Sequence, residues 1–179
     1  YNMSCTSAGE MRQRLDSIRL PRWNELPEFG LYLDQVLLYI GNTLEGLSHT
    51  GEKPLTASMV NNYVKMGAIP PPDKKRYDRV HIALLIVISV LKPVMAIGEV
   101  RDFLANEMDG SYDSRILYDL FCDKFERVYK YAGAELERIM DGFPVSVMGA
   151  RRALVASALH ASAQSAASRI IIEYLTENV

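Results

Sequence analysis

The sequence predicts a mainly α-helical protein. Apolar residues recur at spacings of three and four along most of the 179 residues, a pattern typical of helices with one buried face. Three consecutive prolines at 70–72 cannot donate hydrogen bonds to a sheet, so this extended segment forms at most a very short β hairpin. Because 49% of the residues are hydrophobic, the chain is able to bury a sizeable core.

The first half is expected to start with a polar arm and to continue into two helices. Residues 1–20 are mixed and polar, with a single short amphipathic turn. A strong apolar stripe predicts a helix over 29–47, and a polar loop then leads to a short helix over 57–66. Thr56 is placed to cap the start of that short helix, and Gly67 lies where a C-terminal cap is expected.

Four more helices are expected in the rest of the chain. Residues 79–91 are almost continuously apolar and predict a buried helix, which Pro93 either ends or kinks. A short helix over 97–104 and a long one over 113–140 follow. After a loop with Gly142, Pro144 and Gly149, the last helix is predicted over 150–176 and is dominated by Ala and Ser, which indicates close helix packing.

These elements suggest three parts: an N-terminal arm (1–20), a domain (21–104) and a pair of C-terminal helices (113–179). The apolar surface of the last helix fits either packing within the subunit or a symmetric interface. We expect a homodimer. An alternative for the C-terminal helices is a pocket for a small-molecule effector, because ligand sites often form between helices.

The short helix has two chemically different faces. Val60, Tyr63 and Val64 lie on its apolar side, and its polar side carries Ser58, Asn61, Asn62 and Lys65. A compact basic segment with Asp73, Lys74, Lys75, Arg76, Tyr77 and Arg79 follows soon afterwards. Residues 56–92 carry six Lys or Arg and two Asp, a local charge of +4 in a chain whose net charge is -2.

Amides on a helix next to clustered cations suit a DNA groove flanked by phosphates. On this hypothesis Asn61 or Asn62 bonds to adenine, Ser58 reaches a base or a phosphate, and Lys65 lies at the groove edge. Thr56 belongs to the same candidate surface. Lys74, Lys75, Arg76 and Arg79 would bind phosphates, while Tyr77 is expected to anchor the segment on the next helix. The alternative is an ordinary amphipathic surface helix beside a solvated basic turn.

The segment Met59-Val60-Asn61-Asn62-Tyr63-Val64-Lys65-Met66-Gly67-Ala68-Ile69 resembles the DNA-binding domain of MerR-type regulators. Those proteins have a winged helix-turn-helix whose recognition helix carries a pattern like Thr-Leu-Arg-Tyr-Tyr-Glu-x-x-Gly-Leu-Ile. Val60, Tyr63, Gly67 and Ile69 match it. Asn61 stands where the family usually has Arg, Asn62 replaces an aromatic residue, and the wing is shorter and rich in proline.

A closer resemblance covers most of residues 20–100. It runs through Leu20-Pro21-Arg22-Trp23-Asn24-Glu25-Leu26-Pro27, Leu31-Tyr32-Leu33-Asp34-Gln35-Val36, Met59-Val60-Asn61-Asn62-Tyr63-Val64-Lys65 and Lys75-Arg76-Tyr77. These residues resemble an uncharacterised bacterial family of domains of unknown function, DUF1836, which is thought to be similar to MerR domains. The resemblance ends near residue 104. It implies a transcriptional regulator that binds duplex DNA through the 57–66 helix and the basic 73–79 wing, and MerR-type proteins generally dimerise through a helix beyond the DNA-binding domain.

No pattern of catalysis is visible, and we expect neither an enzyme nor a cofactor. His49, His81 and His160 share no motif, and Cys5 and Cys122 have no metal or redox spacing. The carboxylates of the 113–140 helix alternate with Lys and Arg, which indicates a solvated, salt-bridged face.

The longest apolar run, 82–91, is too short to span a membrane, which needs about 20 residues. No secretory signal pattern opens the sequence, so the expected location is the cytoplasm. The competing function is a non-enzymatic protein-interaction module, in which the basic wing binds an acidic protein surface.

Overall fold

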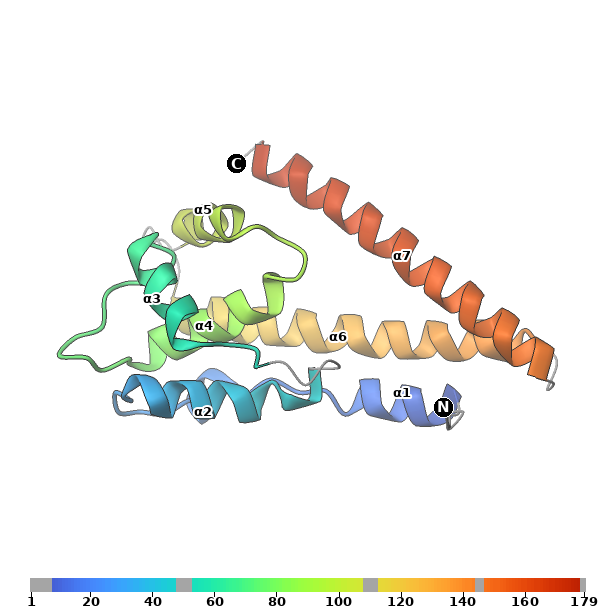
Figure 1. The fold of residues 1–179 in the computed structure, drawn as a ribbon, viewed down its shortest axis with the longest axis horizontal. Helices are drawn as coiled ribbons and strands as arrows, with labels where there is room; N and C mark the ends of the chain where they lie inside the picture. Colours follow the sequence, from blue (N-terminus) through green and yellow to red (C-terminus); the bar gives the residue numbers. More distant parts are fainter. Residues whose placement is uncertain (1–7, 48–52, 108–112, 144–146, 178–179) are drawn as a thin grey trace. The chain divides into compact units, whose positions relative to one another are not determined.

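The computed structural model describes residues 8–47, 53–107, 113–143 and 147–177, and the regular structure of these residues is helical (Figure 1). This confirms the prediction of a mainly α fold. The chain divides into two compact units. One comprises Leu20–Asp123, and the other comprises Tyr1–Arg19 together with Lys124–Val179.

The unit Leu20–Asp123 contains most of the helices predicted for the first two thirds of the chain. A short 3-10 turn, η1 (Trp23–Glu25), precedes α2 (Leu33–Thr43), which a second 3-10 turn, η2 (Glu45–Leu47), follows. Next come α3 (Ala57–Lys65), α4 (Arg79–Leu91) and α5 (Ile97–Glu107). The first turns of α6 (Ser114–Asp141) also belong to this unit. The helix predicted over 29–47 is thus shorter and begins at Leu33.

Helix α4 forms the centre of this unit. It contacts α2 and α5, and every residue from His81 to Ile88 is buried. Asp78 caps its N-terminus by accepting a hydrogen bond from the His81 amide at 3.1 Å. Burial alone would raise the pKa of the Asp78 carboxyl, but the hydrogen bonds from His81 outweigh it, so this pKa lies below its ordinary value.

Caps define both ends of α3, as predicted. The Thr56 hydroxyl accepts a hydrogen bond from the Met59 amide at 3.3 Å, which satisfies one of the donors at the start of the helix. Gly67 follows the helix with φ +73°, a left-handed conformation that glycine adopts without a steric penalty. The short helix therefore has the bounds that its flanking residues encode.

The proline-containing segment after α3 forms no strand in the part of the chain that the structure describes. It makes two isolated antiparallel bridges, Leu31 with Tyr77 and Asp73 with Arg76. Between the second pair the chain reverses at Lys74 (φ 46°) and Lys75 (φ 65°), and the Arg76 amide donates to the Asp73 carbonyl at 2.7 Å. Two consecutive residues with positive φ are the geometry of a tight hairpin turn that usually carries Asn-Gly.

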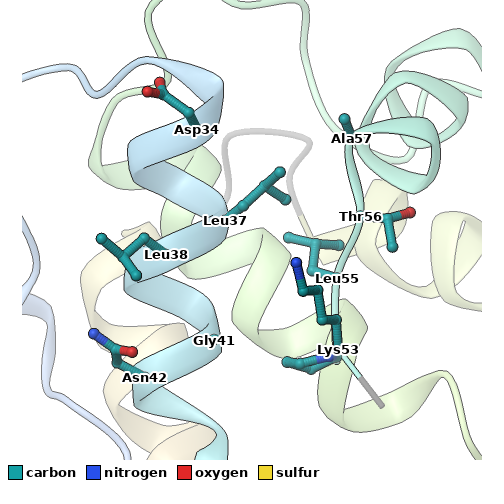
Figure 2. A pocket seen from close by; sticks show the side chains of 10 residues that line it. Asp34, Leu37, Leu38, Gly41, Asn42, Lys53, Leu55, Thr56 and Ala57 are labelled. Atoms are coloured by element: carbon teal, nitrogen blue, oxygen red, sulfur yellow. The ribbon is translucent and has the colours of Figure 1, made fainter.

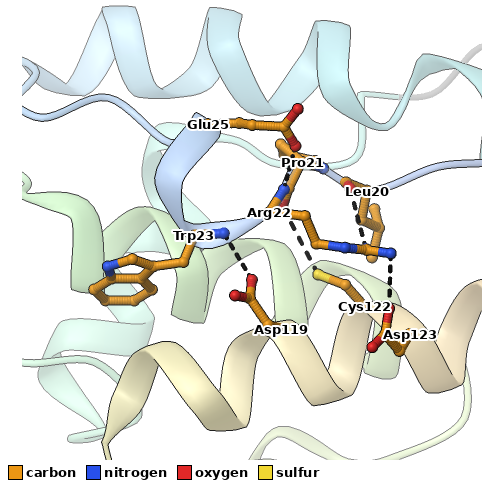
Figure 3. Close-up of polar contacts among 8 residues, drawn as sticks. All are labelled: Leu20, Pro21, Arg22, Trp23, Glu25, Asp119, Cys122 and Asp123. Atoms are coloured by element: carbon orange, nitrogen blue, oxygen red, sulfur yellow. Dashed lines mark hydrogen bonds and ion pairs between the residues drawn. The ribbon is translucent and has the colours of Figure 1, made fainter.

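The segment before α2 is tied to the first turns of α6 (Figure 3). The Arg22 guanidinium pairs with Asp123 at 2.8 Å, and the Trp23 amide donates to Asp119 at 2.8 Å. Cys122 is fully buried, its Sγ lies 3.7 Å from the carbonyl of Pro21, and burial raises the pKa of its thiol. This compact unit therefore extends past residue 104, where the sequence analysis ends the domain.

The second unit is built from α1 (Ala8–Asp16), the rest of α6 and α7 (Val147–Glu177). The region expected to be an arm thus contains a helix. Arg12 of α1 forms an ion pair with Glu137 of α6, and a Cβ at Gly133 would lie 3.4 Å from the Leu15 side chain. Because glycine occupies that position, α1 approaches α6 closely.

Helix α7 begins three residues earlier than predicted, so Gly149 lies in its first turn and not in a loop. Ala153 is buried, whereas Leu159 and Ile170 are 66% and 67% exposed. Every side chain from Ala161 to Ile171 is exposed. None of the described helices is both long and apolar enough to cross a membrane.

Candidate nucleic-acid interface

Helix α3 presents the polar face that the sequence predicts. Ser58, Asn61, Asn62 and Lys65 are exposed, while Val60 and Tyr63 are buried against the domain. Burial raises the pKa of the Tyr63 hydroxyl, which fits its role as a core residue. The Asn62 amide nitrogen lies 3.3 Å from the Met66 sulfur, and a thioether is a weak acceptor that leaves the amide able to bond elsewhere.

Thr56 differs from the other predicted residues of this helix. Its hydroxyl accepts from the helix backbone, so its function in the structure is to cap α3. It is also exposed, at the edge of the polar face. Any contact that Thr56 makes to a ligand therefore has to be compatible with the capping bond.

We call Lys74 and Lys75 the wing tip. Both are exposed, and in the described part of the chain neither has a hydrogen bond or an ion pair. Their positive φ angles are costly for residues with a Cβ, on the order of 1–2 kcal/mol each. The turn therefore presents two ammonium groups at positions where other residues would be less strained.

Arg76 is held within the domain. Its guanidinium donates to the Gly30 carbonyl at 3.1 Å and to the Tyr32 hydroxyl at 3.2 Å, and lies over the Tyr32 ring at 4.6 Å from the centroid. Arg76 was predicted to bind phosphate together with the two lysines. The structure separates it from them, because its guanidinium already has three intramolecular contacts.

Tyr77 and Arg79 also have partners inside the unit. Tyr77 is buried, packs edge-on against the His81 ring at 5.5 Å between centroids, and so forms the predicted anchor. The Arg79 guanidinium lies 3.5 Å from Glu28 and 5.9 Å from the centroid of the Trp23 ring. Among the cations of the predicted site, Arg76 and Arg79 thus have partners inside the unit, whereas Lys65 and the wing tip are exposed and have no such partner in the described residues.

The partners of these arginines were missed at the sequence level. Tyr32 precedes Arg76 by 44 residues, and Trp23 and Glu28 lie more than 50 residues before Arg79. No periodicity links positions so far apart. The short antiparallel bridge between Leu31 and Tyr77 joins the two segments next to these contacts.

A groove of about 480 Å³ lies between α2 and the segment that leads into α3 (Figure 2). Leu37 and Leu55 provide apolar surface, and Asp34, Asn42 and Lys53 are polar residues at its edges. Its volume falls within the range of small-molecule sites. The effector pocket expected between the C-terminal helices stays a prediction, whereas this groove belongs to the unit that carries α3.

The described residues contain no cluster of three or more His, Cys, Asp or Glu that would hold a metal ion. His49 and Cys5 lie outside those residues. His81 is buried and pairs with Asp78 at 2.6 Å, and His160 lies 3.9 Å from Glu135. Each of these histidines contacts a carboxylate of its own unit.

Comparison with known proteins identifies the family of the chain. Its model, described as a domain of unknown function (DUF1836), matches residues 21–131. The match extends beyond residue 104 and includes Asp119, Cys122 and Asp123, the α6 residues that hold the segment before α2. Neither the curated proteins nor the solved structures contain a significant match. Since the family model covers more than half of the sequence, this protein belongs to the DUF1836 family.

Proposed function

We propose that this protein is a transcriptional regulator that binds duplex DNA through a MerR-like winged helix-turn-helix. Helix α3 would enter the major groove, and the wing would lie on the adjacent phosphate backbone. The observation that carries the proposal is the chemistry of two exposed surfaces of the same unit. Helix α3 exposes amide, hydroxyl and ammonium groups on one face, and the wing tip exposes two lysines without intramolecular partners in the described residues.

The residues of α3 would read the bases. Asn61 has the amide that bonds bidentately to adenine, and Ser58 reaches a base or a phosphate one turn earlier. Lys65, in the last turn, would contact the groove edge. Lys74 and Lys75 would bind phosphates, which positions the protein but carries no sequence information.

We further propose that two copies pair through α7. Ala156, Leu159, Ala163, Ala166 and Ile170 follow one another at spacings of three and four, which is the pattern of a helix-pairing seam. No charged residue occurs from 153 to 168, although most of these side chains are exposed. Pairing would cover this surface and bring two DNA-binding units to one operator.

The proposal can be tested by selecting bound sequences from a random duplex pool. Wild type is compared with the double variant Lys74→Ala/Lys75→Ala and with Lys124→Ala/Lys130→Ala, a control that loses the same charge from exposed positions on α6. We expect an enriched motif with wild type and control. The wing-tip variant should bind all sequences more weakly, with a salt dependence flatter by about two units of slope.

Asn61→Ala tests base recognition separately. We expect it to relax the preference at one position of the motif at a cost of about 1–3 kcal/mol. An equal loss on every sequence would instead assign Asn61 to a phosphate contact. If wild type enriches no sequence from the pool, the proposal of a DNA-binding regulator is overturned. The favoured function is then a protein-interaction module, in which the wing tip binds an acidic protein surface.

A further inference from the structure

We infer that Arg76 is a positioning residue of the wing and does not bind phosphate. It fastens the wing to residues 30–32, and the phosphate contacts of the wing are left to Lys74 and Lys75. This inference rests on the proposed DNA-binding function for its consequence in binding. Its structural part stands on contacts within the domain.

Three contacts fix the Arg76 side chain to one short segment. Its two terminal nitrogens donate to the Gly30 carbonyl and the Tyr32 hydroxyl, at 3.1 and 3.2 Å. The guanidinium plane also lies over the Tyr32 ring, 4.6 Å from its centroid. These contacts use two of the five N–H donors of the guanidinium and one of its faces, and they hold both terminal nitrogens toward residues 30–32.

The backbone beside these contacts is paired as well. The Leu31 amide donates to the Tyr77 carbonyl at 2.9 Å, and the Tyr77 amide donates to the Leu31 carbonyl at 2.8 Å. A Cβ at Gly30 would lie only 2.9 Å from the Arg76 Cβ. Glycine at position 30 therefore allows the Arg76 stem to lie directly against the backbone of the facing segment.

This attachment matters because the wing has little other structure. Its base is joined by one residue pair, and the tip is a tight turn at Lys74 and Lys75. If the base moved, both lysines would move with it. Holding the base in place reduces the entropy that binding has to remove, so Arg76 would raise DNA affinity without releasing a counterion from the DNA.

The shape of arginine gives a direct way to separate the two roles. A lysine binds phosphate as a point charge, but it lacks the planar fork that donates to two oxygens and stacks on an aromatic ring. Arg76→Lys should therefore preserve a phosphate contact and lose the attachment. Tyr32→Ala should lose the attachment without changing the charge of the wing.

The first experiment needs no DNA. Amide hydrogen exchange at Leu31 and Tyr77 is measured in wild type, Arg76→Lys, Tyr32→Ala and the control Arg115→Lys. We expect exchange to accelerate about two- to fivefold in the first two variants, as the loss of one exposed cation–π contact predicts, and to stay unchanged in the control. Unchanged exchange in both variants would overturn the inference, whatever the protein binds.

The second experiment measures affinity for the selected duplex as a function of salt. Arg76→Lys and Tyr32→Ala should each weaken binding about two- to fivefold with an unchanged salt slope, and the double variant should be no weaker than either single one. Two results together would overturn the inference and make Arg76 a phosphate ligand. Arg76→Lys would bind the duplex as tightly as wild type, and Arg76→Ala would lower the slope of the salt dependence by about one. If wild type binds no duplex, the proposed function fails, and hydrogen exchange alone decides the role of Arg76.

Discussion

Helices α4 and α7 both contain long stretches without Asp, Glu, Lys or Arg, but they meet opposite environments. In α4, His81 to Ile88 is buried without interruption, and neighbouring helices of the same unit supply the cover. In α7, Ala153 is buried, whereas Ala161 to Ile171 is exposed. The two helices differ in residue size as well, because α4 is built from Ile, Leu and Val and α7 mainly from Ala and Ser.

The difference shows that absence of charge does not by itself tell whether or by what a helix is covered, because it occurs both in a buried helix and in an exposed one. Large aliphatic side chains in α4 contribute enough apolar area to form the core of one domain. Small side chains in α7 contribute less area and favour close approach to another helix. We therefore assign α4 to folding of the subunit and propose that α7 serves assembly of two subunits.

The largest expected effect separates the two helices by stability. Leu85 is fully buried, so Leu85→Ala should lower the free energy of unfolding by about 2–5 kcal/mol, through lost burial and the cavity left behind. Leu159→Ala should change the stability of the monomer by no more than about 0.5 kcal/mol, because this side chain is exposed. Urea unfolding at low protein concentration measures both. A comparable loss in the two variants would contradict the comparison.

The second prediction concerns the proposed pairing of α7. Leu159→Glu should raise the dissociation constant of the dimer at least about a hundredfold, or about 2.7 kcal/mol, because it places a carboxylate in the seam of each helix. Ser165→Glu is the control, since helical geometry directs this position away from the seam. Sedimentation velocity over a range of concentrations gives both constants. If wild type sediments as a monomer at every concentration, the proposal of a dimer is wrong.

Each of the two units contains a carboxylate with a lowered pKa, and the pH dependence of unfolding compares how much each one stabilises the fold. The pKa of Asp78 is lowered in the folded protein, so its stabilising contribution is present above the unfolded value of about 3.9 and is lost as the pH falls through the folded value. Asp78→Ala should cost about 1 kcal/mol at pH 7 through loss of the cap. The difference in the free energy of unfolding between this variant and wild type should become smaller near pH 3.

Glu135 is the matched carboxylate of the second unit. Its hydrogen bond from Arg138 lowers its pKa as well, but this ion pair is exposed and screened by solvent. Glu135→Gln should therefore leave the acid dependence of unfolding nearly unchanged. The urea midpoints of unfolding of both variants at pH 7 and pH 3 test this contrast between Asp78 and Glu135. A larger change with pH in Glu135→Gln than in Asp78→Ala would contradict it.

The smallest expected effect concerns the exposed turn within the well-packed unit. Replacing Lys74-Lys75 with Asn-Gly should raise stability by about 0.5–1 kcal/mol, because the left-handed geometry costs these residues less than lysine and the added freedom of the unfolded glycine offsets part of the gain. Lys74→Ala/Lys75→Ala removes the same charges and keeps the strained geometry. Thermal unfolding should show no gain in stability for this double variant. A gain equal to that of the Asn-Gly variant would mean that the loss of charge, and not the turn geometry, causes the effect.

Local signals in the sequence were sufficient for many elements. The bounds of α4 follow from its continuous apolar run, and the ends of α3 follow from Thr56 and Gly67, which act within a few residues of where they occur. The polar face of α3 followed from helical spacing alone. Each of these inferences depends on contacts between residues close together in the chain.

Contacts between distant segments were not predictable in this way. Arg76 belongs by composition with Lys74 and Lys75, yet Tyr32 and Gly30 give it a different environment. Asp119 and Asp123 were expected on a solvated, salt-bridged face, and Asp123 is exposed and ion-paired, but their partners Trp23 and Arg22 come from a segment far away in the sequence. Spacing within a helix identifies its faces, but it gives no information about which remote segment packs on a face.

Because Cys122 is buried, the rate at which its thiol reacts measures how often the domain opens locally. The side chain is fully covered, and the thiol lies against the carbonyl of Pro21 where the segment before α2 meets α6. A thiol reagent reaches this sulfur only when the two segments separate, so the rate of its modification reports how often they do so. In a variant without Cys5, this rate would follow opening of Leu20–Asp123 without an introduced cysteine.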